Sequence, residues 1–287
     1  MKKNIFKILI FVVFFLGLSM MLYPTVSDWY NKKMNSYVVS NYEKQISEVP
    51  NEEYVTMMEE ARAFNQTLSK SIQAFENGSP NEEAYLNVFD DFNGIIGYIE
   101  IEKINVNLPI YHGTEESVLQ KAIGHLEGSH FPTGDIGNNT VLTGHTGLPS
   151  ADLFTGLIEI ELGDTFTISV LDQVFTYEVY AITVVEPSEV SLLESIEGKD
   201  VVTLVTCTPY GINSHRLLVQ GEQITAEDDT SSYSVFETVS TQSTEKESFE
   251  FDYSAVKQII TVLITFVWVF LFVVIIALYI RKRKGRD

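Results

Sequence analysis

Residues 201–219 read VVTLVTCTPYGINSHRLLV, the most informative stretch of the chain for its fold. Two apolar runs, residues 201–205 and 217–219, have the composition of β-strands and enclose a loop that contains proline and glycine. If the two strands pair as a hairpin, Cys207 at the end of the first faces Arg216 at the start of the second. The eight residues between them form a longer connection than the usual hairpin loop of about 2–5 residues. Because long loops often carry function, we expect a functional site at the mouth of this hairpin.

Further strands are predicted by the alternation of apolar and polar residues. This pattern of half-buried strands occurs at residues 104–108, 166–170 and 175–179. Apolar spacing and helix-end signals predict short helices at residues 114–123, with Thr114 as N-cap, at 151–157 and at 188–196. Many short strands with a few short helices favour a mainly β fold, a closed barrel or a sandwich, over a parallel α/β sheet.

The regions on either side of this β-rich part have a different amino-acid composition. Residues 27–75 are rich in Glu, Lys, Gln, Met and Ala, which predicts two helices divided at Pro50. Residues 77–80, Asn-Gly-Ser-Pro, are a turn signal. Residues 225–254 are rich in Ser, Thr, Glu and Asp without a clear period, so we interpret them as a flexible stalk.

Two apolar segments predict membrane spans. Residues 259–280 carry no charge, are long enough to cross a bilayer, and are followed by a basic tail. Residues 8–23 follow Lys2, Lys3 and Lys7 and have the pattern of a signal peptide or an uncleaved signal anchor. The sequence has no Ala-x-Ala cleavage site there, which favours the anchor. The positive-inside rule then places both termini in the cytoplasm and the middle of the chain outside the cell.

These patterns divide the chain into six predicted regions. They are an N-terminal signal anchor (1–26), a helical N-terminal region (27–93), a β-rich domain (94–224), an acidic Ser/Thr-rich stalk (225–258), a transmembrane helix (259–280) and a basic cytoplasmic tail (281–287).

The composition excludes several classes of protein. The chain carries 19 Lys and Arg against 39 Asp and Glu, a formal charge of −20, which is unfavourable for binding the phosphates of nucleic acid. A single cysteine permits no intrachain disulfide and no multi-cysteine zinc site. A hydrophobic fraction of 45% is too high for a disordered chain. We expect no metal ion and no organic cofactor. Acidic pairs such as Asp90 with Asp91 are more often solvated loops than calcium ligands, and their spacing fits no calcium-loop motif.

Three residue types in this chain suit acyl transfer. A guanidinium beside a thiol, here Arg216 beside Cys207, favours the thiolate nucleophile and can bind an oxyanion in a fixed fork geometry. Cysteine chemistry on an amide also needs a general acid to protonate the departing amine, most often a histidine. Of the five histidines, His145 lies in a loop of small residues, Thr-Gly-His-Thr-Gly-Leu-Pro at positions 143–149, which leaves an imidazole accessible.

Each of these residues alone has a simpler interpretation. A lone cysteine is commonly a small buried hydrophobe, a lone arginine a surface salt-bridge residue, and a lone histidine a loop residue. The hypothesis of a catalytic site therefore depends on the three together. His215 is predicted to point to the other face of its strand, and the remaining histidines are interpreted as structural: His112, His125, His130 and His215.

The segments that contain these residues resemble one enzyme family. Residues 203–217 resemble the signature of sortases, the cysteine transpeptidases of Gram-positive bacteria, and are most similar to the class C branch that assembles pili. Residues 143–149 resemble the histidine loop of that family. The resemblance runs from residue 94 to 221 and includes three further segments typical of the branch, residues 97–101, 108–114 and 124–128.

The resemblance implies a closed eight-stranded barrel and a two-step acyl transfer. It makes Cys207 the nucleophile that attacks the Thr–Gly bond of an LPXTG-like sorting signal, and His145 the acid that protonates the departing amine. Arg216 holds the substrate and stabilises the oxyanion, and Thr206 is a candidate substrate contact. A lysine amine of another pilin subunit then resolves the thioester. The expected partners are LPXTG-type pilins and the membrane, without nucleic acid or cofactor.

Two features depart from the class C pattern. Members of that branch usually carry a lid with an Asp-Pro-aromatic anchor before the barrel, whereas this chain contains no Asp-Pro pair and has residues 77–83 in that region. We therefore expect a lid that is absent, divergent or weakly held. Thr146 stands where the branch commonly has arginine, which we interpret as a change in loop polarity and not in mechanism.

Other functions are weighed against this one. A housekeeping sortase would join surface proteins to the peptidoglycan precursor, and only the acceptor distinguishes it from a pilin polymerase. A non-enzymatic surface protein, itself a sortase substrate, is disfavoured because no LPXTG-like motif precedes residues 259–280. A papain-like or caspase-like protease is disfavoured because neither family's signature surrounds Cys207.

Overall fold

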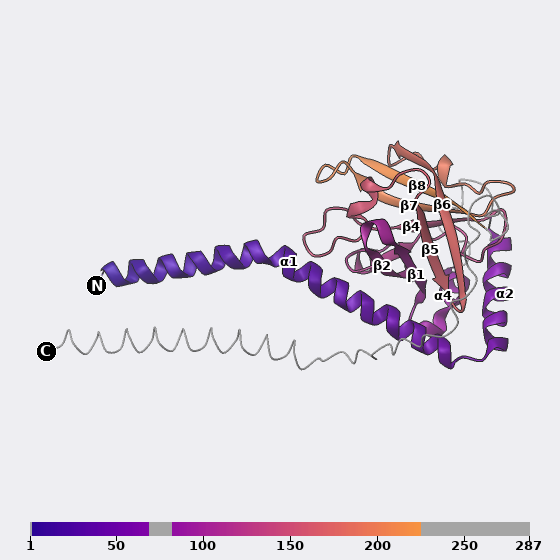
Figure 1. The fold of residues 1–287 in the computed structure, drawn as a ribbon, viewed down its shortest axis with the longest axis horizontal. Helices are drawn as coiled ribbons and strands as arrows, with labels where there is room; N and C mark the ends of the chain where they lie inside the picture. Colours follow the sequence, from indigo (N-terminus) through magenta and orange to yellow (C-terminus); the bar gives the residue numbers. More distant parts are fainter. Residues whose placement is uncertain (1, 69–81, 225–287) are drawn as a thin grey trace, which may run out of the picture. The chain divides into compact units, whose positions relative to one another are not determined.

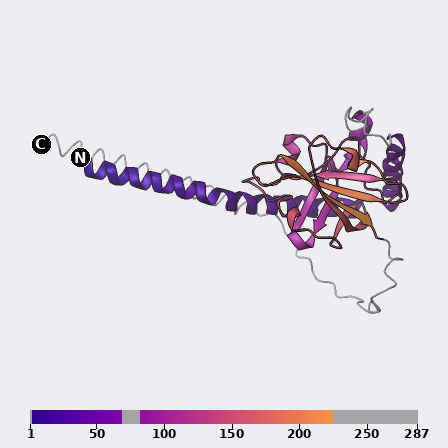
Figure 2. The same ribbon diagram turned by 90° about the horizontal axis from the view of Figure 1, so that it is seen from above.

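The fold is a closed β-barrel of eight strands, as predicted. The computed structural model describes residues 2–68 and 82–224. Around the barrel the strands follow the order β1-β2-β3-β4-β7-β8-β6-β5. Figures 1 and 2 show the barrel from two directions. Their bounds are β1 (Ile95–Ile101), β2 (Val106–His112), β3 (Ile123–His125), β4 (Asn139–Thr143), β5 (Thr165–Val170), β6 (Gln173–Val185), β7 (Val201–Thr208) and β8 (His215–Gln223). Closure pairs every one of these strands on both sides, so none presents an open edge.

Two of the strand pairs are parallel, and they position the functional site. β2 pairs with β3 and β4 pairs with β7 in parallel, whereas the other ladders are antiparallel. A parallel pair needs a crossover connection, because the chain must return to the starting end of the barrel. Between β4 and β7 the chain passes through β5 and β6 on the far side of the barrel. Residues that are distant in the sequence therefore become neighbours at the ends of β4 and β7.

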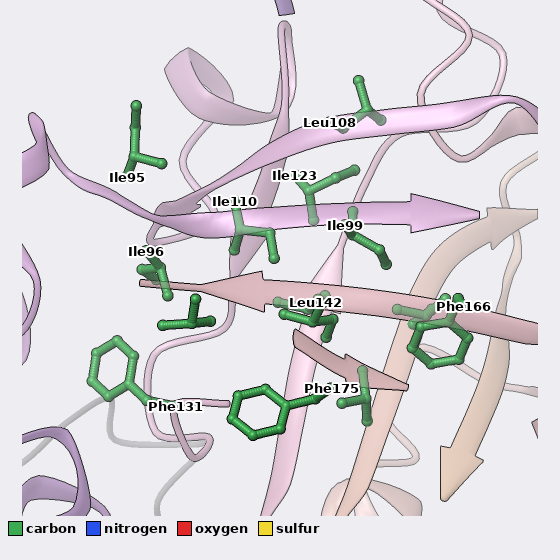
Figure 3. Packing of buried hydrophobic residues seen from close by; sticks show 14 of the residues in the cluster. Ile95, Ile96, Ile99, Leu108, Ile110, Ile123, Phe131, Leu142, Phe166 and Phe175 are labelled. Carbon is green, nitrogen blue, oxygen red and sulfur yellow. The ribbon is translucent and has the colours of Figure 1, made fainter. Parts of the chain in front are cut away.

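The barrel interior is filled by the inward-facing side chains of the strands. Ile99, Ile110 and Leu142 come from three different strands and are completely buried, and Figure 3 shows them gathered with their neighbours between the strands. The alternation that predicted β5 and β6 is confirmed, because the apolar members are buried: Phe166, Ile168, Val170, Phe175, Tyr177 and Val179. Burial of such side chains contributes roughly 1.5–3 kcal/mol each to stability, which makes this interior the main source of barrel stability.

The N-terminal region is helical and binds the barrel. Its helices are α1 (Lys2–Glu48), α2 (Asn51–Thr67) and α4 (Glu82–Asn87). The first two are divided at Pro50, as predicted. Tyr42 of α1 is buried, and its hydroxyl donates to the Ile96 carbonyl (3.2 Å) and accepts from the Leu171 amide (2.8 Å). The barrel end of α1 is therefore part of the same folded unit as the strands.

The helix α1 is also the candidate membrane anchor. It continues without interruption through Pro24, so the predicted anchor (1–26) and the helix that follows it are one element (Figure 1). Among the described residues it is the one helix that is long and apolar enough to cross a membrane. The stalk, the second membrane segment, the basic tail and the turn at residues 77–80 lie outside the described residues, and their predictions stay predictions.

The helix predicted at residues 114–123 is wrong over most of its length. Only α5 (Glu116–Leu119) is helical, its N-cap is Glu115 and not Thr114, and the predicted C-terminal end belongs to β3. The reason is packing at Gly124, whose Cα faces the carbonyl oxygen of Gly113. A Cβ on Gly124 would lie 2.3 Å from that oxygen, so the chain approaches β2 closely and pairs with it.

Three other predicted boundaries are also corrected. In place of the predicted helices stand single turns of 3-10 helix, at Thr155–Glu159 and at Ser191–Leu193. The strand predicted at residues 104–108 begins only at Val106, because a 3-10 turn at Glu102–Ile104 precedes it. Asn105 between them has a φ of 51°, a left-handed conformation that ends the turn and starts the strand.

A buried carboxyl group at the start of β7 makes barrel stability depend on pH. Asp200 is 4% exposed; its Oδ2 accepts from the Tyr177 hydroxyl (2.9 Å), and its Oδ1 has no partner among the described residues. Desolvation raises the pKa of Asp200 to about 7. The pKa of Asp200 is therefore higher in the folded chain than in the unfolded chain. Its contribution to the free energy of unfolding is fully present below about pH 4 and is lost as the pH rises through 7.

We therefore expect Asp200→Asn to be stabilising at alkaline pH. The amide of the variant stays neutral at every pH. Between pH 5 and pH 8 the free energy of unfolding should therefore fall by about 2–3 kcal/mol more in the parent than in the variant. Urea unfolding of both full chains in detergent at the two pH values measures this difference. Equal losses in parent and variant would show that the Asp200 carboxyl is not protonated in the folded barrel.

Candidate active site

The parallel pairing of β4 with β7 brings His145 beside Cys207. Thr143 faces Val205 in this ladder, and His145 and Cys207 each follow two residues later in chains that run the same way. The amide of Gly144 donates to the carbonyl of Val205 (3.1 Å), which extends the pairing one step past β4. The two predicted catalytic residues therefore lie at the same end of the barrel.

The antiparallel pairing of β7 with β8 places Arg216 opposite Cys207, as predicted from the hairpin. The ladder continues one pair further, to Thr208 with His215, so the connecting loop is shorter than predicted. Nη1 of Arg216 donates to the carbonyls of Asn213 (3.3 Å) and His215 (3.1 Å). No carboxylate forms an ion pair with Arg216 in the part of the chain that the structure describes. Its charge therefore remains available to a substrate.

A groove of about 400 Å³ opens beside these residues. Cys207, His145, Arg216 and Thr206 contribute to its lining. The apolar part of the lining comes from α5, β4, β6, β7, β8 and the segments after β3 and β6: Leu119, Leu126, Val141, Val185, Pro187, Val190, Leu193, Val205 and Leu218. The groove thus joins the thiol, the imidazole and the guanidinium of the predicted catalytic residues to an apolar surface, which suits an extended peptide with apolar residues near the thiol.

Contacts from two directions hold the loop that carries His145. The Thr206 hydroxyl donates to the Gly144 carbonyl (2.7 Å), and the Phe154 amide donates to the His145 carbonyl (3.1 Å). At Gly144 a Cβ would lie 2.7 Å from Ile123 and 2.9 Å from the Phe154 ring. Glycine at this position therefore allows close packing, and Gly144→Ala would displace the loop that carries His145.

Thr206 lines the groove, but its hydroxyl is already engaged. The side chain is 4% exposed, and its hydrogen bond to Gly144 ties β7 to the His145 loop. The predicted substrate contact stays a prediction. The geometry adds a second role, in which Thr206 fixes the position of the loop.

Glu116 is a neighbour of His145 that the sequence analysis did not identify. Its Oε2 lies 3.4 Å from Nε2 of His145, and Gln120 donates to its Oε1 (2.6 Å). The Gln120 hydrogen bond, followed by that of His145, lowers the pKa of Glu116. The pair joins α5 to the end of β4, so it arises from tertiary structure and has no signal in local spacing.

We expect Glu116→Gln to reduce peptide cleavage by about 2–3-fold at low ionic strength. The Glu116 side chain is 67% exposed, and exposed ion pairs contribute little and are screened by salt. Initial rates measured at low and at high salt should therefore converge for parent and variant at high salt. Gln120→Ala is the matched control, because it removes the other partner of Glu116. A salt-independent loss would contradict an electrostatic role.

The other histidines lie outside the groove lining. His125 is fully buried and stacks on Phe131 at 4.7 Å between ring centroids. Its Nδ1 accepts from the Tyr85 hydroxyl (3.1 Å) and its Nε2 donates to the His130 carbonyl (2.9 Å). Desolvation lowers the pKa of His125 to about 3, which keeps it neutral at physiological pH. It therefore acts as a polar member of the core.

Comparisons with known proteins agree with this geometry. A family model described as a sortase domain matches residues 99–224. The chain is similar to the crystal structure of sortase C from Streptococcus pneumoniae, whose description concerns catalysis and pilin substrate specificity. The TM-score is 0.59 and the identity 41%, covering 66% of this chain and 97% of that one. It is also similar to a sortase C from Clostridium perfringens described as containing the C-terminal cell wall sorting motif. There the TM-score is 0.57 and the identity 36%, covering 66% and 99% of the two chains.

A comparison with curated proteins gives the same family. Sortase D of Bacillus subtilis is 32% identical over 132 residues, which cover 45% of this chain and 64% of that protein. The strand pairings that assemble Cys207, His145 and Arg216, together with these similarities, show that the chain belongs to the sortase family of cysteine transpeptidases, with class C sortases among its structural relatives.

Proposed function

We propose that this sortase cleaves a sorting signal of the LPXTG type and transfers its acyl group to a lysine amine of a pilin subunit. The Cys207 sulfur bonds to the threonine carbonyl carbon, and the Thr–Gly amide bond breaks. The glycine amine leaves with a proton from His145, while Arg216 holds the substrate and stabilises the oxyanion. The thioester that remains keeps the acyl group reactive toward an incoming amine.

The apolar groove beside Cys207 is the observation that carries this proposal. Val141, Leu193 and Leu218 form a small buried cluster beneath it, separate from the main barrel core. Around the cluster pack the partly buried side chains of Leu126, Val185, Val190 and Val205. The leucine and proline of the sorting signal are the residues that such a surface accommodates, since burial of apolar area drives their binding.

The acceptor distinguishes the two sortase functions that fit the site. The similarity to class C sortases favours a pilin lysine, and the net charge of −20 favours the approach of a lysine-bearing partner. Attachment of surface proteins to the peptidoglycan precursor is the alternative, because the same thioester reacts with either amine.

We further propose that α1 anchors the barrel to the outer face of the cell membrane. The apolar part of α1 follows three lysines, which the positive-inside rule places in the cytoplasm. The predicted span at residues 259–280 with its basic tail places the C-terminus on the same side. The barrel then lies on the side where sorting signals and pilins meet.

We also propose that Thr206 acts on the substrate indirectly, by holding the His145 loop through its hydrogen bond to Gly144. Thr206→Val keeps the shape of the side chain but removes the donor, whereas Thr206→Ser keeps the donor. Loosening the His145 loop should lower kcat about tenfold in the valine variant and leave the serine variant close to the parent. Steady-state kinetics with a sorting peptide distinguishes this role from a direct substrate contact of the hydroxyl, which would raise KM in the valine variant and leave KM of the serine variant close to the parent.

Intact-mass spectrometry of the full chain in detergent tests the proposed function. With an LPXTG peptide the parent should gain the mass of the acyl fragment, and Cys207→Ala should not. Addition of a lysine-bearing pilin domain should then release the fragment onto the pilin. Transfer to a peptidoglycan-type amine but not to pilin would favour the alternative acceptor. The absence of an adduct on a Cys207 that still reacts with a thiol reagent would contradict the proposed substrate.

A further inference from the structure

The first extracellular turns of α1 bind the loop that follows His145. Nδ2 of Asn31 donates to the Ser150 carbonyl (2.7 Å), and Oδ1 of Asp28 accepts from the Asp152 amide (2.9 Å). Lys32 adds ion pairs to both aspartates. Lys32 is 52% exposed and Asp152 61%, so these ion pairs contribute little, whereas the two hydrogen bonds reach the loop backbone directly.

The same loop returns to the catalytic histidine within a few residues. The Phe154 amide donates to the His145 carbonyl (3.1 Å), and the Gly147 amide donates to the Thr155 hydroxyl (3.0 Å). The Phe154 ring is fully buried and packs against Gly144, directly before the histidine. A displacement at residues 150–152 therefore reaches the backbone of His145 through Phe154.

The loop contains a strained residue that its surroundings must hold. Leu153 has a φ of 40°, a left-handed conformation that residues with a side chain rarely adopt. It lies directly after Asp152, whose amide binds α1, and its side chain is 5% exposed. Such a conformation persists only where the neighbouring contacts determine it, and α1 supplies contacts on its N-terminal side.

We infer that Asp28 and Asn31 of the membrane helix are positioning residues for the general acid His145. The inference rests on the proposed role of His145. The helix ties the acid to the membrane anchor, so the anchor is part of the catalytic scaffold as well as a tether. Neither residue touches the substrate; both act through the backbone of the loop.

This arrangement also sets the height of the active site above the bilayer. The predicted anchor in α1 ends at residue 26, and Trp29 and Tyr30 follow as exposed aromatic residues of the kind that mark a membrane interface. Asn31 lies five residues beyond Val26, about 7–8 Å along the helix. The His145 loop is thus held within about one or two helical turns of the membrane surface, where a substrate anchored in the same membrane presents its cleavage site.

Two alanine variants of the full chain in lipid nanodiscs test the inference. Asp28→Ala removes the acceptor for the Asp152 amide, and Asn31→Ala removes the donor to Ser150. Asp28→Asn keeps an acceptor oxygen and is the conservative rescue. Ser36→Ala is the matched control, because its hydroxyl binds only the Lys32 carbonyl of its own helix.

Two substrates separate a misplaced acid from a general loss of structure. The first is an LPXTG peptide, whose amine leaving group needs a proton. The second is an aryl thioester of the same Leu-Pro-x-Thr sequence, whose thiolate leaves without one. We expect both alanine variants to lose about tenfold in kcat with the amide and less than about twofold with the thioester. Amide hydrogen exchange in residues 146–155 should be faster in both alanine variants than in the parent. Asp28→Asn should restore kcat with the amide substrate and the protection of this segment from exchange.

The reference variant His145→Ala keeps the outcomes distinct. If His145→Ala slows the two substrates equally, the proposed role of His145 fails. If His145→Ala is selective for the amide but both alanine variants cleave it within about twofold of the parent, the positioning role of α1 is wrong. Equal losses of amide and thioester turnover in Asp28→Ala and Asn31→Ala would also overturn it, because they would indicate a general structural defect.

Discussion

Replacing His145 with alanine is expected to slow acylation of Cys207 by an LPXTG peptide by about 10²–10⁴-fold. The register of β4 and β7 places the histidine beside the cysteine, and no other histidine lines the groove. Without an acid, the glycine amine must leave the tetrahedral intermediate unprotonated. Expulsion of the Cys207 thiolate, which regenerates the substrate, is then faster than cleavage of the amide bond. Single-turnover mass spectrometry of the acyl-enzyme measures the rate directly.

The control for this variant is His215→Ala. His215 is exposed beside the same hairpin, where Nδ1 interacts with the Ser214 hydroxyl (2.8 Å), and it does not line the groove. The His215→Ala variant should form the acyl-enzyme at the rate of the parent. In both histidine variants, the rate of alkylation of Cys207 by a small thiol reagent should remain within a few-fold of the parent. An unchanged acylation rate in His145→Ala would remove the histidine from the mechanism.

The local part of the site was predictable from the sequence because it depends on one hairpin. The apolar runs on either side of the loop predict the β7–β8 pairing, and this pairing alone places Cys207 opposite Arg216. The position of His145 has no such local basis. It depends on a parallel ladder between β4 and β7, and the intervening chain forms two other strands. The expectation that His145 lies beside Cys207 therefore came from the family resemblance and not from the periodicity of the sequence.

Pattern analysis did not predict three of the strands, β1, β3 and β4. β3 (Ile123–His125) is completely buried, so it lacks the polar alternation that marks a half-buried strand. Its residues continue the apolar spacing of the preceding helix, and only the close approach at Gly124 shows that they belong to the sheet. The contacts of Asp28 and Asn31 with the His145 loop are equally invisible, because they join single side chains to distant backbone groups.

The second large effect is expected at Arg216. Arg216→Lys keeps the positive charge but loses the planar fork that serves several acceptors at once. In the structure one nitrogen already binds the carbonyls of Asn213 and His215, which fixes the guanidinium in the loop. A lysine ammonium cannot keep these bonds and also serve an oxyanion in the same geometry. We expect a loss of about 10²–10³-fold in kcat, the usual effect of removing one oxyanion donor.

The distribution of the loss between kcat and KM identifies what Arg216 does. Stabilisation of the oxyanion alone predicts a lower kcat with KM unchanged, whereas substrate holding alone predicts a higher KM. Because both roles are proposed, Arg216→Ala should change both parameters and Arg216→Lys mainly kcat. Arg62→Lys is the matched control, since Arg62 pairs with Asp135 (2.9 Å) and does not line the groove. If Arg216→Lys retains the activity of the parent, positive charge alone suffices at this position, and the argument from fork geometry is wrong.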